Sequence, residues 1–351
     1  MRSRAAGVGV RRHCPGRCWK AAAALAGLLL AGALARPAAA AEGPRERMQV
    51  AYAAIGGAMA NLWVAKESGA FARHGLDVEL IYLGSGPKAM AGLIAGDTPF
   101  VQGSGEAMVV ARLAGRDVVG IAETIHTFVF SLMVSPAIAG PEDLRGKVLG
   151  MTRPASSTDF ALRVALRRLG LQPGRDVQVL AVGGVPEILA GIEGGKLHGG
   201  ILSPPILTTA KRRGLRELLD LSTLGTPFQQ AGVVASRAYL QAHPETARRF
   251  LRGYLEGIAV MKQKREFTLQ VIRQYTKADD PEVLAEAYEA YALRTVRRVP
   301  YPTVESVRTV LEWLGAGDPK ARAARAEDFI DPRFLREIEE SGFVKALYEG
   351  R

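Results

Sequence analysis

Apolar and polar positions follow two periods along this chain, and the order of the two periods repeats. Some segments alternate with the period of two that is typical of β-strands, and others carry apolar residues at helical spacing. The order strand, helix, strand is predicted twice, at residues 49–53, 61–73 and 77–83 and again at 147–151, 158–168 and 177–181. Strands that alternate with helices predict α/β structure with mainly parallel sheets.

An internal repeat supports two copies of one structural unit. Residues 84–104 and 183–203 align at an offset of 99 positions, and six of the 21 aligned positions are identical. These are Gly84/Gly183, Pro87/Pro186, Ala91/Ala190, Gly92/Gly191, Gly96/Gly195 and Ser104/Ser203. Each copy predicts a Gly-rich loop, a helix opened by proline and a short apolar strand. Two such copies predict two similar α/β lobes, with a cleft between them that can hold a small molecule.

The remaining pattern predicts a hinge and a helical tail. Strands are expected at 117–123, 127–134 and 231–236, and we expect 130–134 and 231–236 to cross between the lobes side by side as a two-stranded hinge. From Pro244 onward the chain is almost entirely amphipathic helix in pattern. The predicted organisation is a leader at 1–41, the first part of lobe 1 at 48–134, lobe 2 at 135–230, and a return crossing with a tail packed on lobe 1 at 231–351.

Charge is concentrated at the N-terminus. The formal net charge is +11, but residues 1–41 hold seven basic residues and no acidic one, which leaves 39 basic and 35 acidic residues in the rest. The main support for a nucleic-acid partner therefore disappears. A basic segment up to Lys20, an apolar stretch over 21–35 and small residues at 38–41 together have the form of a secretory signal peptide. We expect cleavage near Ala41 and export to the periplasm, with an uncleaved anchor as the alternative.

Cysteine, histidine and known motifs give no sign of catalysis. Cys14 and Cys18 both lie in the leader, so the exported chain would hold no disulfide, no thiolate metal site and no cysteine nucleophile. His74, His198 and His243 lack metal-ligand spacing, and no nucleophile elbow or phosphate-binding loop is present. We expect no catalytic residue, no metal and no cofactor, although a triad can assemble from distant residues.

Candidate ligand-binding residues lie in the loops that follow strands. Ligands of parallel α/β sheets bind at the carboxyl ends of the strands, where Gly and Ser leave backbone N–H groups accessible and helix N-termini favour anions. The candidates are Ile55, Gly56, Ser85, Gln102 and Ser104 in lobe 1 and Thr152, Ser156, Ser157, Thr158 and Ser203 in lobe 2. Residues 156–159 fit an anion-binding helix start and a plain N-cap equally well.

The aromatic residues and one histidine are weaker candidates. Trp63, Phe128 and Phe130 could line the cleft, but core packing is the better expectation for each. His126 could contact a ligand, although a lone histidine is more often structural or exposed.

Three segments resemble a known family. Residues 61–76 (NLWVAKESGAFARHGL), 91–96 (AGLIAG) and 143–150 (DLRGKVLG) are similar to the nitrate/sulfonate/taurine and thiamine-pyrimidine-precursor substrate-binding proteins of ABC transporters. The resemblance covers about residues 48–260. It implies a type II periplasmic-binding-protein fold whose lobes close over a ligand and whose closed form docks on an inner-membrane permease.

The resemblance also sets the expected function and its alternatives. It implies a monomeric solute-binding protein that captures a small anionic or heterocyclic molecule. One departure is Gln102, which stands where the family's strand often ends in an acidic or small residue. Two alternatives remain open: an enzyme of the same fold that resembles a pyrimidine-precursor synthase, and an envelope receptor that senses a ligand.

Overall fold

The computed structural model describes residues 44–349, which belong to one compact unit over Glu42–Arg351. The predicted signal peptide and both cysteines lie outside the described residues. Among the described helices, none combines the length and the apolar character that crossing a membrane requires.

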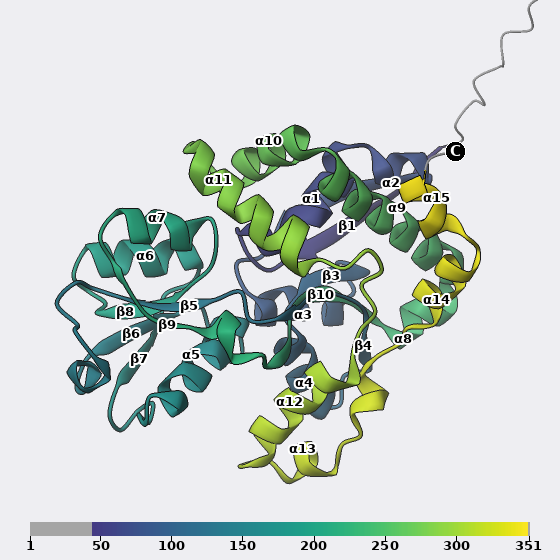
Figure 1. The fold of residues 1–351 in the computed structure, drawn as a ribbon. Helices are drawn as coiled ribbons and strands as arrows, with labels where there is room; N and C mark the ends of the chain where they lie inside the picture. The colour runs from purple at the N-terminus through teal and green to yellow at the C-terminus, as the bar shows by residue number, and fades with distance from the viewer. Residues whose placement is uncertain (1–43, 350–351) are drawn as a thin grey trace, which may run out of the picture. The chain divides into compact units, whose positions relative to one another are not determined.

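Two five-stranded sheets organise the described chain (Figure 1). The first has the order β2-β1-β3-β10-β4, with β1 Glu46–Tyr52, β2 Leu76–Tyr82, β3 Phe100–Gly103, β4 Val118–Thr127 and β10 Pro227–Ser236. The second has the order β7-β6-β8-β5-β9, with β5 Ser131–Val134, β6 Val148–Met151, β7 Gln178–Ala181, β8 Gly199–Leu202 and β9 Arg216–Asp220. We call these sheets, with the helices packed on them, the first and the second lobe.

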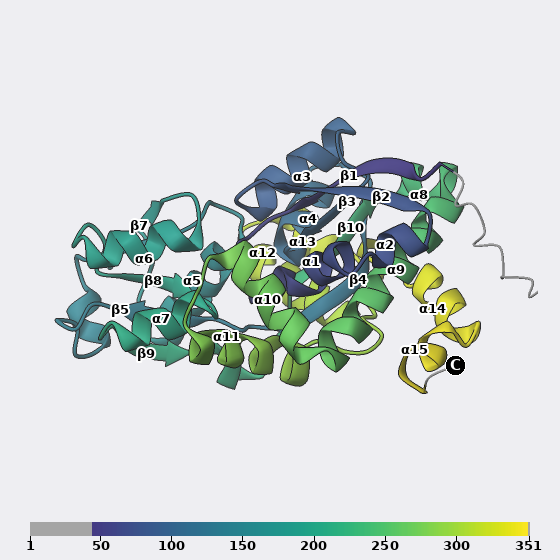
Figure 2. The same ribbon diagram turned by 90° about the horizontal axis from the view of Figure 1, so that it is seen from above.

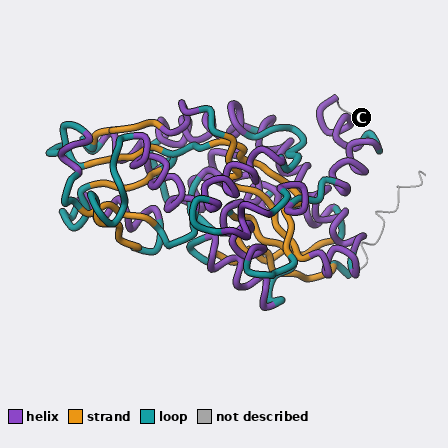
Figure 3. Tube along the Cα trace, turned by 90° about the horizontal axis from the view of Figure 1, so that it is seen from below, coloured by secondary structure: helices purple, strands orange, loops and turns teal. Residues whose placement is uncertain are grey.

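Helices cover both sheets, and most of the chain beyond residue 244 is helical (Figure 3). The α-helices are α1 Ala60–Glu67, α2 Ala70–Arg73, α3 Gly86–Ala95, α4 Gly105–Leu113, α5 Ser157–Arg168, α6 Val185–Glu193, α7 Ile206–Arg212, α8 Arg237–Ala242, α9 Pro244–Gln263, α10 Arg265–Thr276, α11 Pro281–Tyr288, α12 Val304–Gly315, α13 Pro319–Ala323, α14 Arg333–Glu340 and α15 Phe343–Glu349. The shorter turns are η1 Gly57–Met59, η2 Pro141–Leu144, η3 Leu221–Leu224, the π-helical η4 Glu289–Thr295 and η5 Ala326–Phe329.

The internal repeat is visible in the backbone. Gly84 and Gly183 both have positive φ, at 75° and 108°, and Gly96 and Gly195 have φ of 85° and 70°. These left-handed positions are ones that glycine adopts without strain, so the repeated glycines turn the chain at equivalent points before and after α3 and α6. A further glycine, Gly69 with φ of 74°, divides the single helix predicted over 61–73 into α1 and α2.

The expectation of mainly parallel sheets needs correction in both lobes. Strands β1, β2 and β3 are parallel, but β10 runs antiparallel to both β3 and β4, so the sheet is mixed rather than mainly parallel. The second sheet is mixed in the same way, because β5 runs antiparallel to β8 and β9. Each sheet contains one strand that adjoins a crossing between the lobes, β10 in the first and β5 in the second. That strand runs antiparallel to both of its neighbours.

The prediction that 130–134 and 231–236 lie side by side as a hinge is also wrong. Of residues 130–134, Ser131–Val134 form β5 of the second sheet, whereas 231–236 belong to β10 of the first, so the two segments do not pair. The two crossings are instead held together where β4 ends and β10 begins, with Thr127 opposite Pro227. Val129 N also donates to Gln230 Oε1 at 2.6 Å, which ties the outgoing crossing to the returning one.

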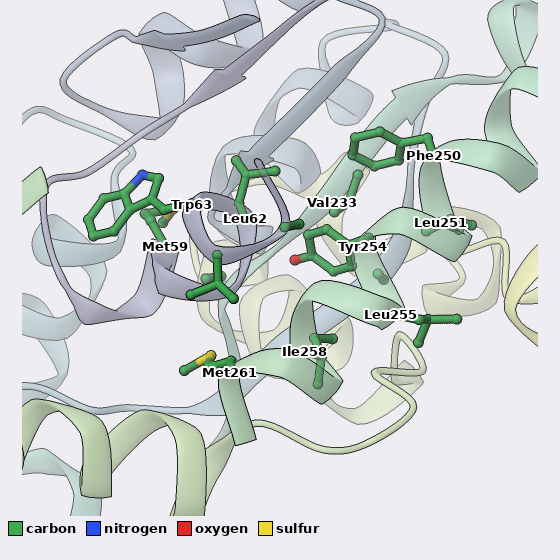
Figure 4. Packing of buried hydrophobic residues seen from close by; sticks show 14 of the residues in the cluster. Met59, Leu62, Trp63, Val233, Phe250, Leu251, Tyr254, Leu255, Ile258 and Met261 are labelled. Atoms are coloured by element: carbon green, nitrogen blue, oxygen red, sulfur yellow. The ribbon is translucent and has the colours of Figure 1, made fainter. Parts of the chain in front are cut away.

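The core of the first lobe lies between its sheet and the helices that follow β10 (Figures 2 and 4). Helix α9 packs against α1 closely enough that a Cβ on Gly257 would lie 2.4 Å from Ala65 Cβ. Trp63 is fully buried in this core, where it stacks on Tyr275 with ring centroids 4.6 Å apart. Trp63 is therefore a core residue, as the sequence favoured.

Candidate functional site

A small enclosed cavity of about 40 Å³ lies between the two lobes, at the ends of strands β1, β2, β3, β6 and β8. Nine of the ten candidate residues line it: Ile55, Gly56, Ser85, Ser104, Thr152, Ser156, Ser157, Thr158 and Ser203. A cavity of this size holds only a few water molecules, so the lobes are closed on one another in this conformation. A hollow of about 930 Å³ beside β1 and β2 is lined by the first lobe alone, and one of about 600 Å³ lies between α6 and α7 of the second lobe and α10 and α11 of the first.

In the first lobe, two helix N-termini have N-cap side chains that make no capping hydrogen bond. Ser85 and Ser104 are the N-cap residues of α3 and α4, and neither side chain caps its own helix. Each serine is only 3% exposed, and neither hydroxyl has a hydrogen-bond partner among the described residues. The two caps are neighbours, because a Cβ on Gly86 would lie 2.7 Å from Ser104 Oγ. Buried hydroxyls without partners beside free N–H groups are able to receive a polar ligand group.

Three hydroxyls of the second-lobe wall are bonded to one another. Thr152 Oγ1 lies 2.8 Å from the hydroxyls of both Ser156 and Thr158, and Ser156 Oγ donates to Arg153 O at 2.7 Å. Ser156 Oγ also accepts from Asp159 N at 3.4 Å and so caps α5. Of the two uses that the sequence allowed for this loop, the N-cap is therefore formed.

The N-terminus of α6, the equivalent of α3 in the repeat, is also occupied. Its cap is Gly184, and the carboxylate of Glu187 folds back toward it, since a Cβ on Gly184 would lie 2.3 Å from Glu187 Oε2. An acidic side chain at a helix N-terminus neutralises the partial positive charge there. The α6 terminus consequently attracts an anionic ligand less than the α3 terminus does.

Gln102 takes a different place from the one expected. It is fully buried, and it is absent from the cavity lining. Its Nε2 donates to Ala58 O and to Asn61 Oδ1, both at 3.0 Å, and its Oε1 accepts from Tyr254 OH at 3.0 Å. Because these bonds use both ends of the amide, Gln102 fixes the loop under the cavity and leaves little capacity for a ligand.

The described cavity lining contains no charged side chain and no cysteine or histidine. A buried carboxyl outside the lining is that of Glu106, in the first turn of α4, which is 4% exposed and whose Oε2 has no partner among the described residues. Burial raises the pKa of Glu106 well above its usual value, and Asp159 of the second lobe raises it further while Arg163 opposes this. Asp159 itself is paired with Arg163 at 2.6 Å. No group of three or more metal-ligating side chains occurs within residues 44–349.

The aromatic candidates divide between core and cavity. Phe128 is buried against Phe228, with ring centroids 4.5 Å apart, and is a core residue. Phe130, for which the sequence favoured the core, is buried and also lines the cavity. His126 stays outside the lining, and burial, followed by the charge of Arg297, lowers its pKa.

Sequence reasoning missed several lining residues, of which Tyr82 is the most exposed. Tyr82 ends β2, lies 5.4 Å from the ring of Tyr52, and reaches the second lobe near Gly184. Its position near the end of the strand predicted at 77–83, just before a Gly-rich loop, was the available signal. Met59, Val185 and Gln230 complete the apolar and amide part of the lining.

Comparison with known proteins establishes the family. Residues 57–266 match the NMT1/THI5-like family, and the chain belongs to this family. The resemblance stated from the sequence is thereby confirmed. No curated protein matches the chain by sequence.

Solved structures share the fold. A protein of Bordetella bronchiseptica RB50 is 20% identical, with a TM-score of 0.76 over 85% of this chain and 98% of that one. The ligand-binding component of an ABC-type import system from Staphylococcus aureus, with zinc bound, is 14% identical, with a TM-score of 0.69 over 84% and 99% of the two chains. The alkanesulfonate-binding protein SsuA of Xanthomonas axonopodis pv. citri, bound to MOPS, is 15% identical, with a TM-score of 0.67 over 84% and 98%. The periplasmic-binding-protein fold with a helical C-terminal part is confirmed.

Proposed function

We propose that the protein is the solute-binding component of an ABC importer, which captures a small molecule between its two lobes and delivers it to an inner-membrane permease. The observation that carries the proposal is the enclosed cavity between the lobes, lined by uncharged polar and apolar side chains from both. A cleft that buries a ligand on all sides suits reversible capture. We expect a monomer that acts in the periplasm after removal of residues 1–41.

The chemistry of the lining supports binding rather than catalysis. An enzyme of this fold would need a nucleophile or a general base in contact with the ligand. The described lining offers hydroxyls, one amide and apolar groups, and it contains no carboxylate or imidazole that could activate a hydroxyl. A synthase-like enzyme and a ligand-sensing receptor remain the alternatives that the experiment below separates.

The first lobe would hold the polar end of the ligand. Ser85 and Ser104, with the N-termini of α3 and α4, offer donors that nothing else uses. Ile55, Met59, Phe130 and Val185 would contact the less polar part. Thr152, Ser156, Ser157, Thr158 and Ser203 would close over it from the second lobe, whereas Gly56 allows close approach of the first-lobe backbone.

The proposal is tested by a thermal-shift screen of the purified protein after expression of the full chain. The panel contains alkanesulfonates, taurine, nitrate, thiamine-pathway pyrimidines, flavins and aromatic carboxylates. A compound at about 100 times its Kd adds about 2.7 kcal/mol to the free energy of unfolding. The mass of the exported protein shows whether cleavage falls near Ala41.

The state of the bound compound separates the alternatives. Recovery of an unchanged compound, together with permease-dependent uptake by cells, supports the importer. A chemically converted compound supports the enzyme, and binding without uptake supports the receptor.

A further inference from the structure

The second lobe meets the first on two flanks of very different chemistry. On one flank α5 packs against α4 and its Phe160 contacts β10 and α12, and on the other α7 lies beside α11 (Figures 1 and 2). Both α11 and α12 follow the return crossing in the sequence, so the helical tail holds the second lobe from two sides. The ligand cavity lies between these flanks.

The α5–α12 flank is apolar and aromatic. Phe160 of α5 is fully buried, stacks on Phe228 with ring centroids 4.9 Å apart, and meets Trp313 of α12 edge-on at 5.3 Å. The Arg167 guanidinium lies 3.9 Å from the centroid of the Trp313 ring. Separation of this flank would expose buried aromatic surface to water and so would be strongly opposed.

The α7–α11 flank is polar and open to solvent. Thr208 Oγ1 donates to Glu286 Oε2 at 2.7 Å, and Arg212 pairs with both Asp280 and Glu282. The Arg212 and Asp280 side chains are 38% and 43% exposed, and that of Glu282 is 78% exposed. Such contacts exchange readily with water and are weakened by salt, so this flank separates far more easily than the other.

The polar flank is connected directly to the cavity. The loop of Ser203 and Pro204 precedes α7, and Pro204 O accepts from Gly57 N of the first lobe at 3.2 Å. On the other side α11 continues into η4, whose Tyr291 packs on Gly57 so closely that a Cβ there would lie 2.3 Å from the ring. Movement of α7 away from α11 would therefore carry Ser203 away from Gly56 and Gly57 and open the cavity.

We propose that α11 is a latch for the second lobe: the cleft closes when Thr208 and Arg212 of α7 engage α11, and it opens at this flank while α5 stays packed on α12. Thr208 and Arg212 are positioning residues, which set ligand affinity without contacting the ligand. The inference extends the proposed function, but its experiment measures closure in the ligand-free protein. Failure of the latch and failure to find a ligand are therefore separate results.

The experiment measures two distances across the cleft by energy transfer between dyes. Cys14 and Cys18 are the only cysteines of the chain, so after both are replaced by serine, dyes can be attached to introduced cysteines alone. One pair, Lys196→Cys with Gln274→Cys, spans the α7–α11 flank, and the other, Arg168→Cys with Lys320→Cys, spans the α5–α12 flank; all four positions are exposed. Each pair is measured without ligand at about 0.05 M and about 0.5 M NaCl, between which exposed ion pairs become largely screened.

The expected result is a change on one flank only. Salt should lower energy transfer across α7–α11 and leave the α5–α12 pair unchanged. Arg212→Glu should lower the ratio of closed to open molecules roughly two- to five-fold for each ion pair lost, and should reverse the salt dependence, because like charges then face each other across the flank. Addition of Glu282→Arg to Arg212→Glu should restore part of the closed population.

A neighbouring arginine provides the matched control. Arg213 pairs with Glu193 inside the second lobe at 2.8 Å, so Arg213→Glu changes the same charge without touching the latch and should behave as the parent protein. Equal effects of Arg212→Glu and Arg213→Glu would overturn the latch. So would equal salt responses of the two dye pairs, or no response in either pair.

Discussion

The two copies of the repeat contribute to opposite walls of one cavity, and the two walls differ in how many of their hydrogen-bonding groups already have a partner. At the first-lobe wall the N-caps of α3 and α4, Ser85 and Ser104, are buried and unpaired. At the second-lobe wall Glu187 fills the start of α6, and Ser156, which lies outside the repeat, is bonded to its neighbours. The equivalent starts of α3 and α6 therefore carry unequal capacity for a ligand.

This difference between the walls indicates which of them has free hydrogen-bonding groups for a ligand. A buried hydroxyl without a protein partner has unused hydrogen-bonding capacity, which a ligand can satisfy. The second-lobe wall, three of whose hydroxyls are bonded to one another, contributes to the stability of its lobe but has fewer free groups for a ligand. We therefore expect the polar end of a ligand to be recognised by the first lobe and enclosed by the second.

The comparison is tested most strongly by deletion of equivalent hydroxyls. Ser104 and Ser203 are related by the repeat, but Ser104 precedes Gly105 and its free N–H, whereas Ser203 precedes two prolines, which have none. With the panel compound that binds, Ser104→Ala should weaken binding about tenfold, and the double variant with Ser85→Ala about 100-fold, since a bond to a charged or buried group contributes about 1.5–3 kcal/mol. Ser203→Ala should change the affinity only slightly.

Calorimetric titration of the four proteins measures these affinities. Circular dichroism of each variant controls for the fold. Equal losses for Ser104→Ala and Ser203→Ala would show that the two walls share the ligand evenly.

The buried carboxyl behind the Ser104 cap gives a second test, through pH. The pKa of Glu106 is higher in the folded protein than in the unfolded chain, so the folded state binds the extra proton and loses stability as pH rises through the folded pKa. Glu106→Gln keeps the shape without the charge and should be more stable than the parent at neutral pH, by about 1–3 kcal/mol, and nearly equal to it at low pH. Urea unfolding at several pH values measures the difference.

A second buried glutamate serves as the control for that measurement. Glu123 accepts bonds from Thr303 N and Oγ1, at 2.8 and 2.7 Å, and from Ser306 Oγ. Glu123→Gln replaces one accepting oxygen with a donor and should destabilise the protein. If Glu106→Gln also lowers stability at neutral pH, Glu106 has a partner that stabilises its charge.

The sequence predicted the lobes and most of the cavity because both depend on local pattern. Gly84 and Gly183 mark the same turn in both copies, and the serines near them follow strands whose ends must meet at the cleft. What it could not predict depends on contacts distant in the sequence. Gln102 reads as a polar residue at a strand end, yet Tyr254, 152 residues later, binds its amide and removes it from the cavity.

The prediction of the hinge was wrong for the same reason, because strand pairing depends on contacts distant in the sequence. Residues 130–134 and 231–236 are both strand-like in pattern, but pattern does not say which sheet a strand joins. Partner choice was decided by β4, which extends to Thr127 and pairs with β10 at Pro227 and along 231–236 before the chain crosses to the second lobe. Likewise Tyr82 alternates like any strand residue, and only the arrangement of the lobes brings it near Gly184.

The smallest effect offers the most direct comparison of the walls, because it needs no ligand. Removal of an unpaired buried hydroxyl eliminates a destabilising group, so Ser104→Ala should raise the free energy of unfolding by about 1 kcal/mol. Ser156→Ala removes a formed N-cap and its bonds to Thr152 and Arg153 and should lower it by about 1 kcal/mol. Thermal unfolding of the ligand-free proteins should therefore shift Tm in opposite directions for the same chemical change. A shift in the same direction would mean that Ser104 has found a partner in the empty protein, and the inequality of the two walls would then have to be sought in the Glu187 carboxylate alone.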